Sequence, residues 1–183
     1  MESKRAIIFI DGSNFYYRIK SLSQKSYSKN TLINFDFKRF FENLLKEKEL
    51  VETRYYVGAV RRENNNPKSE ELYANQQKLL ASLQQKNIKI ILGTIIRHPD
   101  KTYHEKGVDV RIAVEMIRFA RENKYDVAYL ISSDTDLVPA VEEVRAFGKE
   151  VCYVGVFKGQ SFGLSKASNN VILLRSEEIE KFL

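Results

Sequence analysis

Two aspartates stand directly after a short apolar run, where the chain is predicted to pass from a strand into a helix. Residues 127–131 are apolar, as expected for a buried strand. The residues that follow are Ser132, Ser133, Asp134, Thr135 and Asp136. In a parallel α/β sheet this passage lies at the carboxyl edge, where ligands bind. A helix N-cap would account for one such residue, but here five occur in a row.

A third aspartate follows the first predicted strand. Residues 6–10 are apolar without alternation, which is typical of a strand buried on both faces. Asp11 comes next, and Gly12 permits a tight turn into a helix that opens over residues 15–19. Asn14 can either cap that helix or contact a ligand, and both alternatives stay open.

A fourth aspartate, Asp109, lies in the first turn of a helix predicted over residues 108–122. The residues expected on the solvent face of this helix are Arg111, Glu115, Arg118 and Glu122. Asp109 aligns instead with Ala113 and Met116, on or beside the packed stripe. A carboxylate near a helix start stabilises the helix dipole, by about 0.3–1 kcal/mol. That role does not explain why Asp109 faces inward.

The four carboxylates are all expected at strand ends or helix starts on one edge of the sheet. Crowded carboxylates repel, so one or more would bind a proton unless a cation cancels the charge. Oxygen ligands suit Mg²⁺ or Mn²⁺. Such ions hold phosphate oxygens and activate water, which is the chemistry of phosphodiester hydrolysis or phosphoryl transfer. The chain contains no P-loop motif, so that mode of nucleotide binding is disfavoured.

Strands alternate with helices along the chain, which predicts an α/β fold with a mostly parallel sheet and helices on both faces. The predicted strands are residues 6–10, 53–60, 88–96, 127–131 and 150–156, with a short one at 171–174. The other predicted helices are residues 35–48, 70–85, 137–147 and 177–183. In the helix over 70–85, the residues expected to point inward are Leu72, Leu79, Leu80 and Leu83. Polar loops are predicted at 21–30, 61–68 and 97–106, and one domain is expected over 1–183.

Composition excludes some classes of protein. The net charge of +6 and a sequence pI near 9.3 are compatible with a polyanionic partner. Cys152 lies in an apolar run and is expected to be a buried, inert thiol. His98 and His104 have no cysteine pair nearby, which disfavours zinc. The apolar run near the N-terminus is too short for a signal peptide or a membrane span, so we expect a cytoplasmic protein.

Three motifs, in order, resemble those of the NYN domain family, the LabA-like branch of the PIN-like nucleases. They are Phe-Ile-Asp-Gly-Ser-Asn at 9–14, Lys-Gly-Val-Asp-Val at 106–110 and Ser-Ser-Asp-Thr-Asp at 132–136. Residues 161–174 are similar in style to the family's closing strand. The resemblance implies a three-layer PIN-like fold with central strand order 3-2-1-4-5 and a metal-dependent ribonuclease site.

By position, the resemblance also implies roles for individual residues. The positions that match the family's acidic metal site are Asp11, Asp109, Asp134 and Asp136, and Asn14 matches their polar partner. Ser132 and Ser133 match a serine–glycine step, with Ser133 in place of the usual glycine. Leu137 replaces a common phenylalanine, and Glu115 stands where an aspartate is frequent.

An RNA substrate would need cations around the acidic centre and aromatic faces for its bases. The cations expected in loops at this edge are Arg61, Arg62, Arg97, Lys101, Lys106 and Lys158. The aromatic candidates are Tyr16, Tyr17, Tyr103 and Phe162, for which packing is the alternative role. Lys106 directly precedes the Gly-Val-Asp step and is the main candidate for a phosphate contact. The residues selected as substrate-binding are Ser132, Ser133, Lys106, Arg97 and Tyr16.

The leading hypothesis is a Mg²⁺- or Mn²⁺-dependent ribonuclease that cuts single-stranded RNA. Asp11 and Asp134 would hold the ion, while Asp109 and Asp136 would complete its shell or orient water. The first alternative is a non-catalytic RNA-binding or regulatory module. A haloacid dehalogenase-type phosphatase is disfavoured because Ser13 stands two residues after Asp11. A glycosyltransferase using residues 134–136 is disfavoured by the short chain. A homodimer, or a second protein that supplies specificity, is left open.

Overall fold

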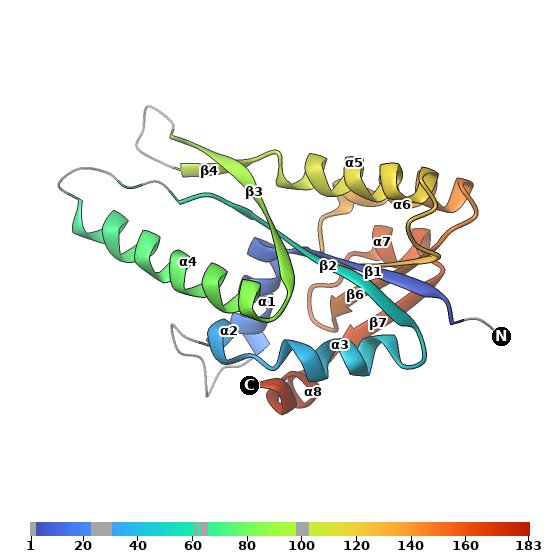
Figure 1. Cartoon of the computed structure of the whole chain (residues 1–183), viewed down its shortest axis with the longest axis horizontal. Helices are drawn as coiled ribbons and strands as arrows, with labels where there is room; N and C mark the ends of the chain where they lie inside the picture. Colours follow the sequence, from blue (N-terminus) through green and yellow to red (C-terminus); the bar gives the residue numbers. More distant parts are fainter. Residues whose placement is uncertain (1–2, 23–30, 61, 63–65, 98–102) are drawn as a thin grey trace.

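A seven-stranded sheet in the order β4-β3-β2-β1-β5-β6-β7 organises the chain (Figure 1). The computed structural model describes residues 3–22, 31–60, 62, 66–97 and 103–183, with only the backbone at 95–97 and 103–105. The strands are β1 Arg5–Asp11, β2 Glu49–Gly58, β3 Ile88–Arg97, β4 Tyr103–Lys106, β5 Val127–Ile131, β6 Glu150–Val156 and β7 Asn170–Leu174. All neighbouring strands pair in parallel except β3 and β4.

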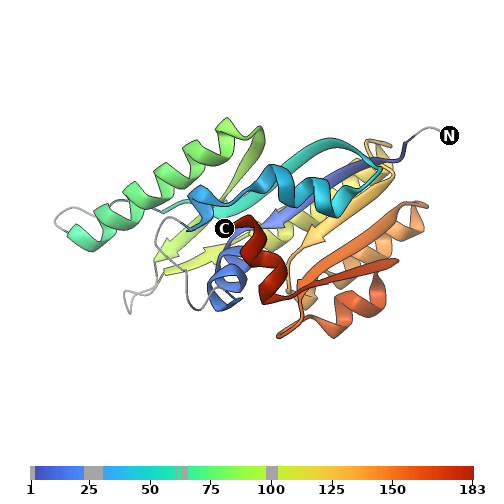
Figure 2. The same ribbon diagram turned by 90° about the horizontal axis from the view of Figure 1, so that it is seen from below.

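Helices cover both faces of this sheet, which makes three layers (Figures 1 and 2). One face is covered by α1 Gly12–Leu22, α2 Thr31–Asn34, α3 Phe37–Leu45, α4 Pro67–Gln85, α8 Ser176–Ile179 and the 3₁₀ turn η2 Glu180–Phe182. The other is covered by α5 Val108–Arg121, the 3₁₀ turn η1 Thr135–Leu137, α6 Val138–Ala146 and α7 Phe162–Ala167. The α/β, PIN-like architecture expected from the sequence is confirmed.

The parallel strands, taken in chain order without β4, are arranged 3-2-1-4-5-6. This confirms the predicted order 3-2-1-4-5 and adds β7 at one edge. β1 is buried on both faces, as its unbroken apolar run predicts. Ile8 and Ile10 belong to the core under α1 and α3, whereas Ile7 and Phe9 belong to the core under α5 and α6.

The segment over 97–106 was predicted as a polar loop, and that was wrong for its second half. Tyr103–Lys106 forms β4, which pairs antiparallel with β3 so that Arg97 faces Tyr103 and Thr94 faces Lys106. Polar residues suffice at this sheet edge because β4 has only one strand partner. His98 and Lys101 lie outside the described residues.

Several helix predictions also needed adjustment. Leu72 was expected to point into the core, but 52% of its surface is exposed. The helix over 137–147 begins as η1 and continues as α6, and that over 177–183 divides into α8 and η2. α2 was not predicted, and residues 23–30 of the predicted loop lie outside the described part of the chain.

An aromatic cluster fixes α1 against the sheet and so positions the start of that helix. The ring of Phe15 lies 5.5 Å from Phe35, 5.9 Å from Phe37 and 5.9 Å from Phe40, centroid to centroid. Phe182 from η2 joins this cluster at 5.4 Å from Phe40. Aromatic pairs at such distances add to the burial of their surface, by about 0.5–1.5 kcal/mol each. The start of α1, and with it the turn that follows β1, is therefore held against one face of the sheet.

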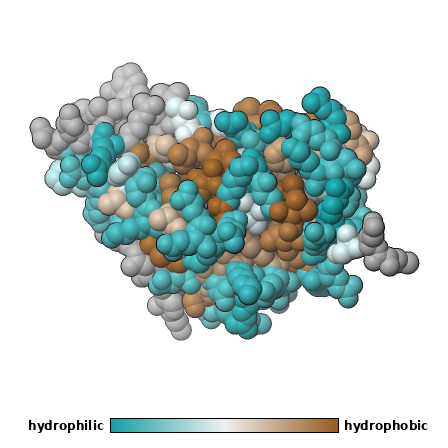
Figure 3. Space-filling model, viewed as in Figure 1, coloured by the Kyte–Doolittle hydropathy of each residue, from teal (hydrophilic) through white to brown (hydrophobic). Residues whose placement is uncertain are grey.

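Polar and charged side chains cover most of the face shown in Figure 3, with apolar side chains gathered near its middle. Across the described residues, no helix has the length and apolar character to span a membrane. Cys152 is buried at 4% exposure, as predicted, and burial raises the pKa of its thiol to about 11.

Candidate active site

The carboxylate of Asp11 is buried at the carboxyl end of β1, with only 6% of the residue exposed. The backbone N–H of Asn14 donates to Asp11 Oδ1 at 3.0 Å, and Asn14 Nδ2 donates to Oδ2 at 3.2 Å. The hydroxyl of Ser132, just beyond β5, donates to the same Oδ2 at 3.1 Å. Asp11 thus caps the first turn of α1, and Asn14 holds Asp11 rather than capping the helix itself.

Asp134 lies beside this group because Ser132 links the two aspartates. Ser132 Oγ accepts a hydrogen bond from the backbone N–H of Asp134 at 3.1 Å. The side chain of Asp134 accepts from the backbone N–H of Asp136 at 3.0 Å, which fixes the start of η1. β1 pairs with β5, which is the condition under which the sequence analysis expects Asp11 and Asp134 to flank one crevice. The crevice itself stays a prediction.

The electrostatics of Asp11 reflect its position. Burial raises the pKa of this carboxyl above its ordinary value, and the charge of Asp134 raises it further. The hydrogen bonds from Asn14 and Ser132 act in the opposite direction but do not outweigh burial. Among the described residues, neither Asp11 nor Asp134 forms an ion pair with a lysine or arginine. The pair therefore carries a negative charge that these side chains leave uncompensated.

Of Asp109 and Asp136, the structure links Asp136 to this pair, through its backbone N–H, which donates to the side chain of Asp134. Asp109 is half-buried in the first turn of α5, and Asp136 is exposed in η1. The two elements contact one another, so both residues lie at the same edge of the sheet. Within the described part of the chain, however, no three His, Cys, Asp or Glu side chains form a group that could hold a metal ion. The expectation that all four carboxylates share one pocket stays a prediction.

The donor atoms that the structure does bring together still fit a hard divalent cation. Asp11 and Asp134 supply carboxylate oxygens, and the Ser132 hydroxyl lies between the Asp11 carboxylate and the backbone N–H of Asp134. Oxygen ligands of this kind suit Mg²⁺ or Mn²⁺, which keep several water ligands and need few protein ligands. A cation here would also offset the burial and the Asp134 charge that raise the pKa of Asp11.

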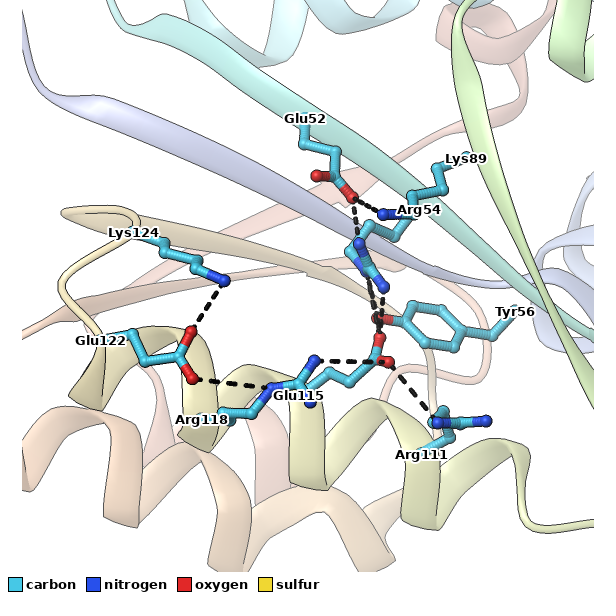
Figure 4. A network of polar contacts seen from close by, with 9 residues as sticks. All are labelled: Glu52, Arg54, Tyr56, Lys89, Arg111, Glu115, Arg118, Glu122 and Lys124. Atoms are coloured by element: carbon cyan, nitrogen blue, oxygen red, sulfur yellow. Dashed lines mark hydrogen bonds and ion pairs between the residues drawn. The ribbon is translucent and has the colours of Figure 1, made fainter.

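Glu115 was predicted on the solvent face of its helix, and that was wrong. The residue is 5% exposed and accepts from Arg54 Nη2 at 2.7 Å, from Arg54 Nε at 3.1 Å and from the Tyr56 hydroxyl at 2.7 Å (Figure 4). Burial and then the bond to Glu115 raise the pKa of Tyr56, so its hydroxyl stays a donor. Figure 4 shows Arg111 and Arg118 approaching the same carboxylate from α5. Glu115 is thereby committed to Arg54 on β2 and not to the site.

The substrate-binding candidates lie in different places. Ser132 and Ser133 are part of the hydrogen-bonded cluster, and Lys106 is exposed at the end of β4. Tyr16 is half-buried and lines a groove of about 480 Å³ between α1 and α4. Arg61, Lys101 and the side chains of Arg97 and Tyr103 lie outside what the structure describes. Of the other aromatic candidates, Tyr17 is 66% exposed and Phe162 is 79% exposed.

The sequence analysis missed Arg18, which belongs to the same network. Ser133 Oγ donates to Asn14 Oδ1 at 2.5 Å and accepts from Arg18 Nη2 at 2.8 Å. A chain of hydrogen bonds therefore runs from Arg18 through Ser133 and Asn14 to Asp11. The signal that could have found it is spacing, since residues four apart on a helix share a face and Asn14 and Arg18 are so placed.

Comparison with known proteins shows to which family the chain belongs. The family model described as the NYN domain matches residues 5–175. The chain belongs to the NYN domain family. This confirms the resemblance that its three motifs carry, and it places the chain in a family of PIN-like nucleases.

This NYN domain also resembles proteins of known structure. It is similar to a protein of unknown function from Vibrio parahaemolyticus, with 25% identity and a TM-score of 0.69. That match covers 95% of this chain and 96% of the other. An isopentenyl phosphate kinase (11% identity, 82% of this chain, 90% of that chain) has a TM-score of 0.40, too low to carry an argument. No curated protein matches the chain.

Proposed function

We propose that this NYN domain is a divalent-metal-dependent ribonuclease that hydrolyses phosphodiester bonds of single-stranded RNA. The observation that carries the proposal is the pair formed by Asp11 and Asp134. Asp11 is a buried carboxylate with a raised pKa beside a second carboxylate, and among the described residues its hydrogen bonds come from the neutral donors of Asn14 and Ser132. Carboxyl groups whose pKa is perturbed in this way are frequent at functional sites. Family membership supports the choice of nuclease.

Asp11 and Asp134 would hold Mg²⁺ or Mn²⁺. When bound there, the ion would supply a Lewis acid for the phosphate and lower the pKa of a water molecule. Asn14 and Ser132 would keep the Asp11 carboxylate oriented through the hydrogen bonds at 3.0–3.2 Å. Such supporting contacts fix the geometry of a site as much as the ligands do.

Asp109 and Asp136 would act from the rim of this site. Asp109 lies in the first turn of α5, and Asp136 lies in η1, directly after Asp134 and Thr135. These two elements are in contact. In the proposed mechanism, either residue would orient an attacking water molecule beside Asp134. Lys106 and Arg97 would contact phosphates, and Tyr16 would contact a base in the groove beside α1. A cytoplasmic location, and a homodimer or a second protein that supplies specificity, remain predictions.

RNA cleavage tests the proposal. Purified protein is incubated with end-labelled single-stranded RNA in Mn²⁺, in Mg²⁺ and in EDTA. We expect cleavage that needs the metal, and a loss of about 10²–10³-fold for Asp134→Asn, the size typical for removing one charge-stabilising group. Glu142→Gln on the exposed side of α6 is the matched control and should cut like the wild type.

Two outcomes would contradict the proposal. Equal cleavage by Asp134→Asn and the wild type would show that the activity arises elsewhere. RNA binding without turnover in any of the metals would favour the alternative, a non-catalytic RNA-binding or regulatory module with the same fold. The phosphatase and glycosyltransferase interpretations are set aside because the NYN match spans residues 5–175.

A further inference from the structure

A groove lined by three cations and two carboxylates lies next to the Asp11 cluster, on the side of β6 and β7. It has a volume of about 830 Å³. Its lining residues are Arg18, Ser21, Leu22, Phe157, Lys158, Arg175, Ser176, Glu177 and Glu180. Figure 2 shows α1 and α8 side by side here, and the two helices are in contact. Three separate segments thus contribute one cation each, from α1, from the end of β6 and from the end of β7.

The backbone joins the two loop segments. The N–H of Phe157 donates to the carbonyl of Leu174 at 3.0 Å, which ties the end of β6 to the end of β7. Both strands run parallel to β1 and β5, so their ends lie at the same edge as Asp11 and Asp134. The groove is therefore a continuation of the candidate active edge.

Arg18 connects the groove to the carboxylates. Its Nη2 contacts Ser133 of the cluster at 2.8 Å while its side chain lines the groove. No described carboxylate forms an ion pair with Arg18. Gly159 makes room for the guanidinium, because a Cβ built there would lie 2.4 Å from Arg18 Nη1. An arginine in this state keeps donors for a planar or tetrahedral anion.

Phe157 gives the same groove an aromatic face. The ring is 54% exposed, and the guanidinium carbon of Arg175 lies 5.3 Å from its centroid. Exposed aromatic rings beside cations are the usual platform for unpaired bases, since every base has a face to stack. Glu177 and Glu180 bring negative charge to the α8 wall, which leaves the α1 and β6 sides as the path for phosphates.

We propose that this groove binds the single-stranded RNA next to the bond that is cut, with Arg18 and Lys158 on phosphates and Phe157 stacked on a base. The inference rests on the proposed function for one point only, namely that the bound RNA lies next to the bond that is cut. Binding itself does not depend on turnover. A double helix would keep its bases paired and unavailable to Phe157, so the site should distinguish single strands from duplexes.

The test measures binding in EDTA, where a metal-dependent enzyme does not turn over. A fluorescently labelled ten-nucleotide single-stranded RNA is titrated with each variant, and anisotropy gives the dissociation constant. We expect Phe157→Ala to bind about 5- to 150-fold more weakly, the range for losing one stacked base. Lys158→Gln should lower the slope of log K against log salt by about 0.7, as expected for one phosphate contact.

Two further variants test the opposite change in affinity and provide a control. Glu177→Gln should bind more tightly, because it removes a negative charge from the groove. Arg121→Gln removes an exposed cation at the far end of α5 and should bind like the wild type. Arg18→Gln should weaken binding as well. Among the described residues, no hydrogen bond or ion pair joins the side chain of Lys158 or Phe157 to the Asp11 cluster, so these two variants isolate the groove. Thermal melting shows that each variant is folded.

The outcomes separate this inference from the proposed function. Weaker binding by Lys158→Gln and Phe157→Ala supports the groove whether or not RNA is cut. Wild-type affinity in both variants, or an equal loss in Arg121→Gln, overturns the groove even if cleavage is found. If Lys158→Gln and Phe157→Ala lose as much affinity for an RNA duplex of the same length as they lose for the single strand, the assignment to single strands is overturned.

Discussion

Breaking the ion pair beneath α5 should destabilise the protein strongly, and Arg54→Met is the perturbation that does so. Arg54 is 4% exposed and Glu115 is 5% exposed, so both charges are removed from water. Arg54 donates twice to the same Glu115 oxygen, at 2.7 and 3.1 Å. The guanidinium carbon of Arg54 lies 4.9 Å from the centroid of the Phe119 ring. A methionine side chain fills much of the same volume against that ring. The change therefore removes the charge and its donors more than the packing.

The magnitude follows from what is left behind. Removing one partner of a buried pair typically costs about 3–5 kcal/mol, because the other charge stays buried. Here Tyr56 still donates to Glu115 at 2.7 Å, and Arg111 and Arg118 lie 3.9 Å from its second oxygen. These contacts offset part of the loss, so we expect about 3 kcal/mol in the free energy of unfolding.

Urea denaturation followed by circular dichroism measures this loss. The double variant Arg54→Met/Glu115→Met replaces both charges and should return to within about 1 kcal/mol of the wild type. Glu122→Gln is the control, since Glu122 pairs with Lys124 and Arg118 at the surface, where ion pairs contribute little to stability. A loss below about 1 kcal/mol for Arg54→Met would refute the reasoning, as would a double variant no more stable than the single one.

Two other predictions concern residues at or near the candidate site. Ser132→Ala removes the donor to Asp11 and the acceptor for the Asp134 N–H, so RNA cleavage should fall by about 10–100-fold while the fold persists; unchanged cleavage rates would show that Ser132 does not support the site. Cys152, whose thiol has its pKa raised to about 11 by burial, should resist a thiol reagent at pH 8 in the native protein and react once guanidinium unfolds it; rapid native reaction, followed by absorbance, would contradict this.

The strand ends could be predicted from the sequence because burial there leaves a local pattern. Unbroken apolar runs mark β1 and β5, and the polar residues that end them, Asp11 and Ser132, meet because the strands are neighbours. The same logic placed Asp134 beside Asp11. It could not show whether the carboxylates of Asp109 and Asp136 share a metal site with that pair, since spacing fixes the edge of the sheet but not the distance between side chains. Among the described residues, no three such side chains form a group that could hold a metal ion.

Other features depend on partners far along the chain. Glu115 looks solvent-facing by helical spacing, but Arg54, 61 positions earlier, draws it beneath α5. β4 has no apolar pattern of its own and is formed by pairing with β3. Leu72 has inward spacing, yet it lines the groove between α1 and α4 rather than the core. Each of these depends on tertiary contacts that local patterns do not encode.

Uptake of Mn²⁺ tests the central claim most directly, and isothermal titration calorimetry measures it without RNA. The raised pKa of Asp11 means that this carboxyl destabilises the metal-free fold as pH rises through that pKa, and that protons compete with the metal below it. The account predicts binding by the wild type and by Glu142→Gln that weakens as pH falls. It predicts affinity about 10–100-fold lower for Asp134→Asn. No heat of binding in the wild type, or the same affinity in Asp134→Asn, would contradict the account.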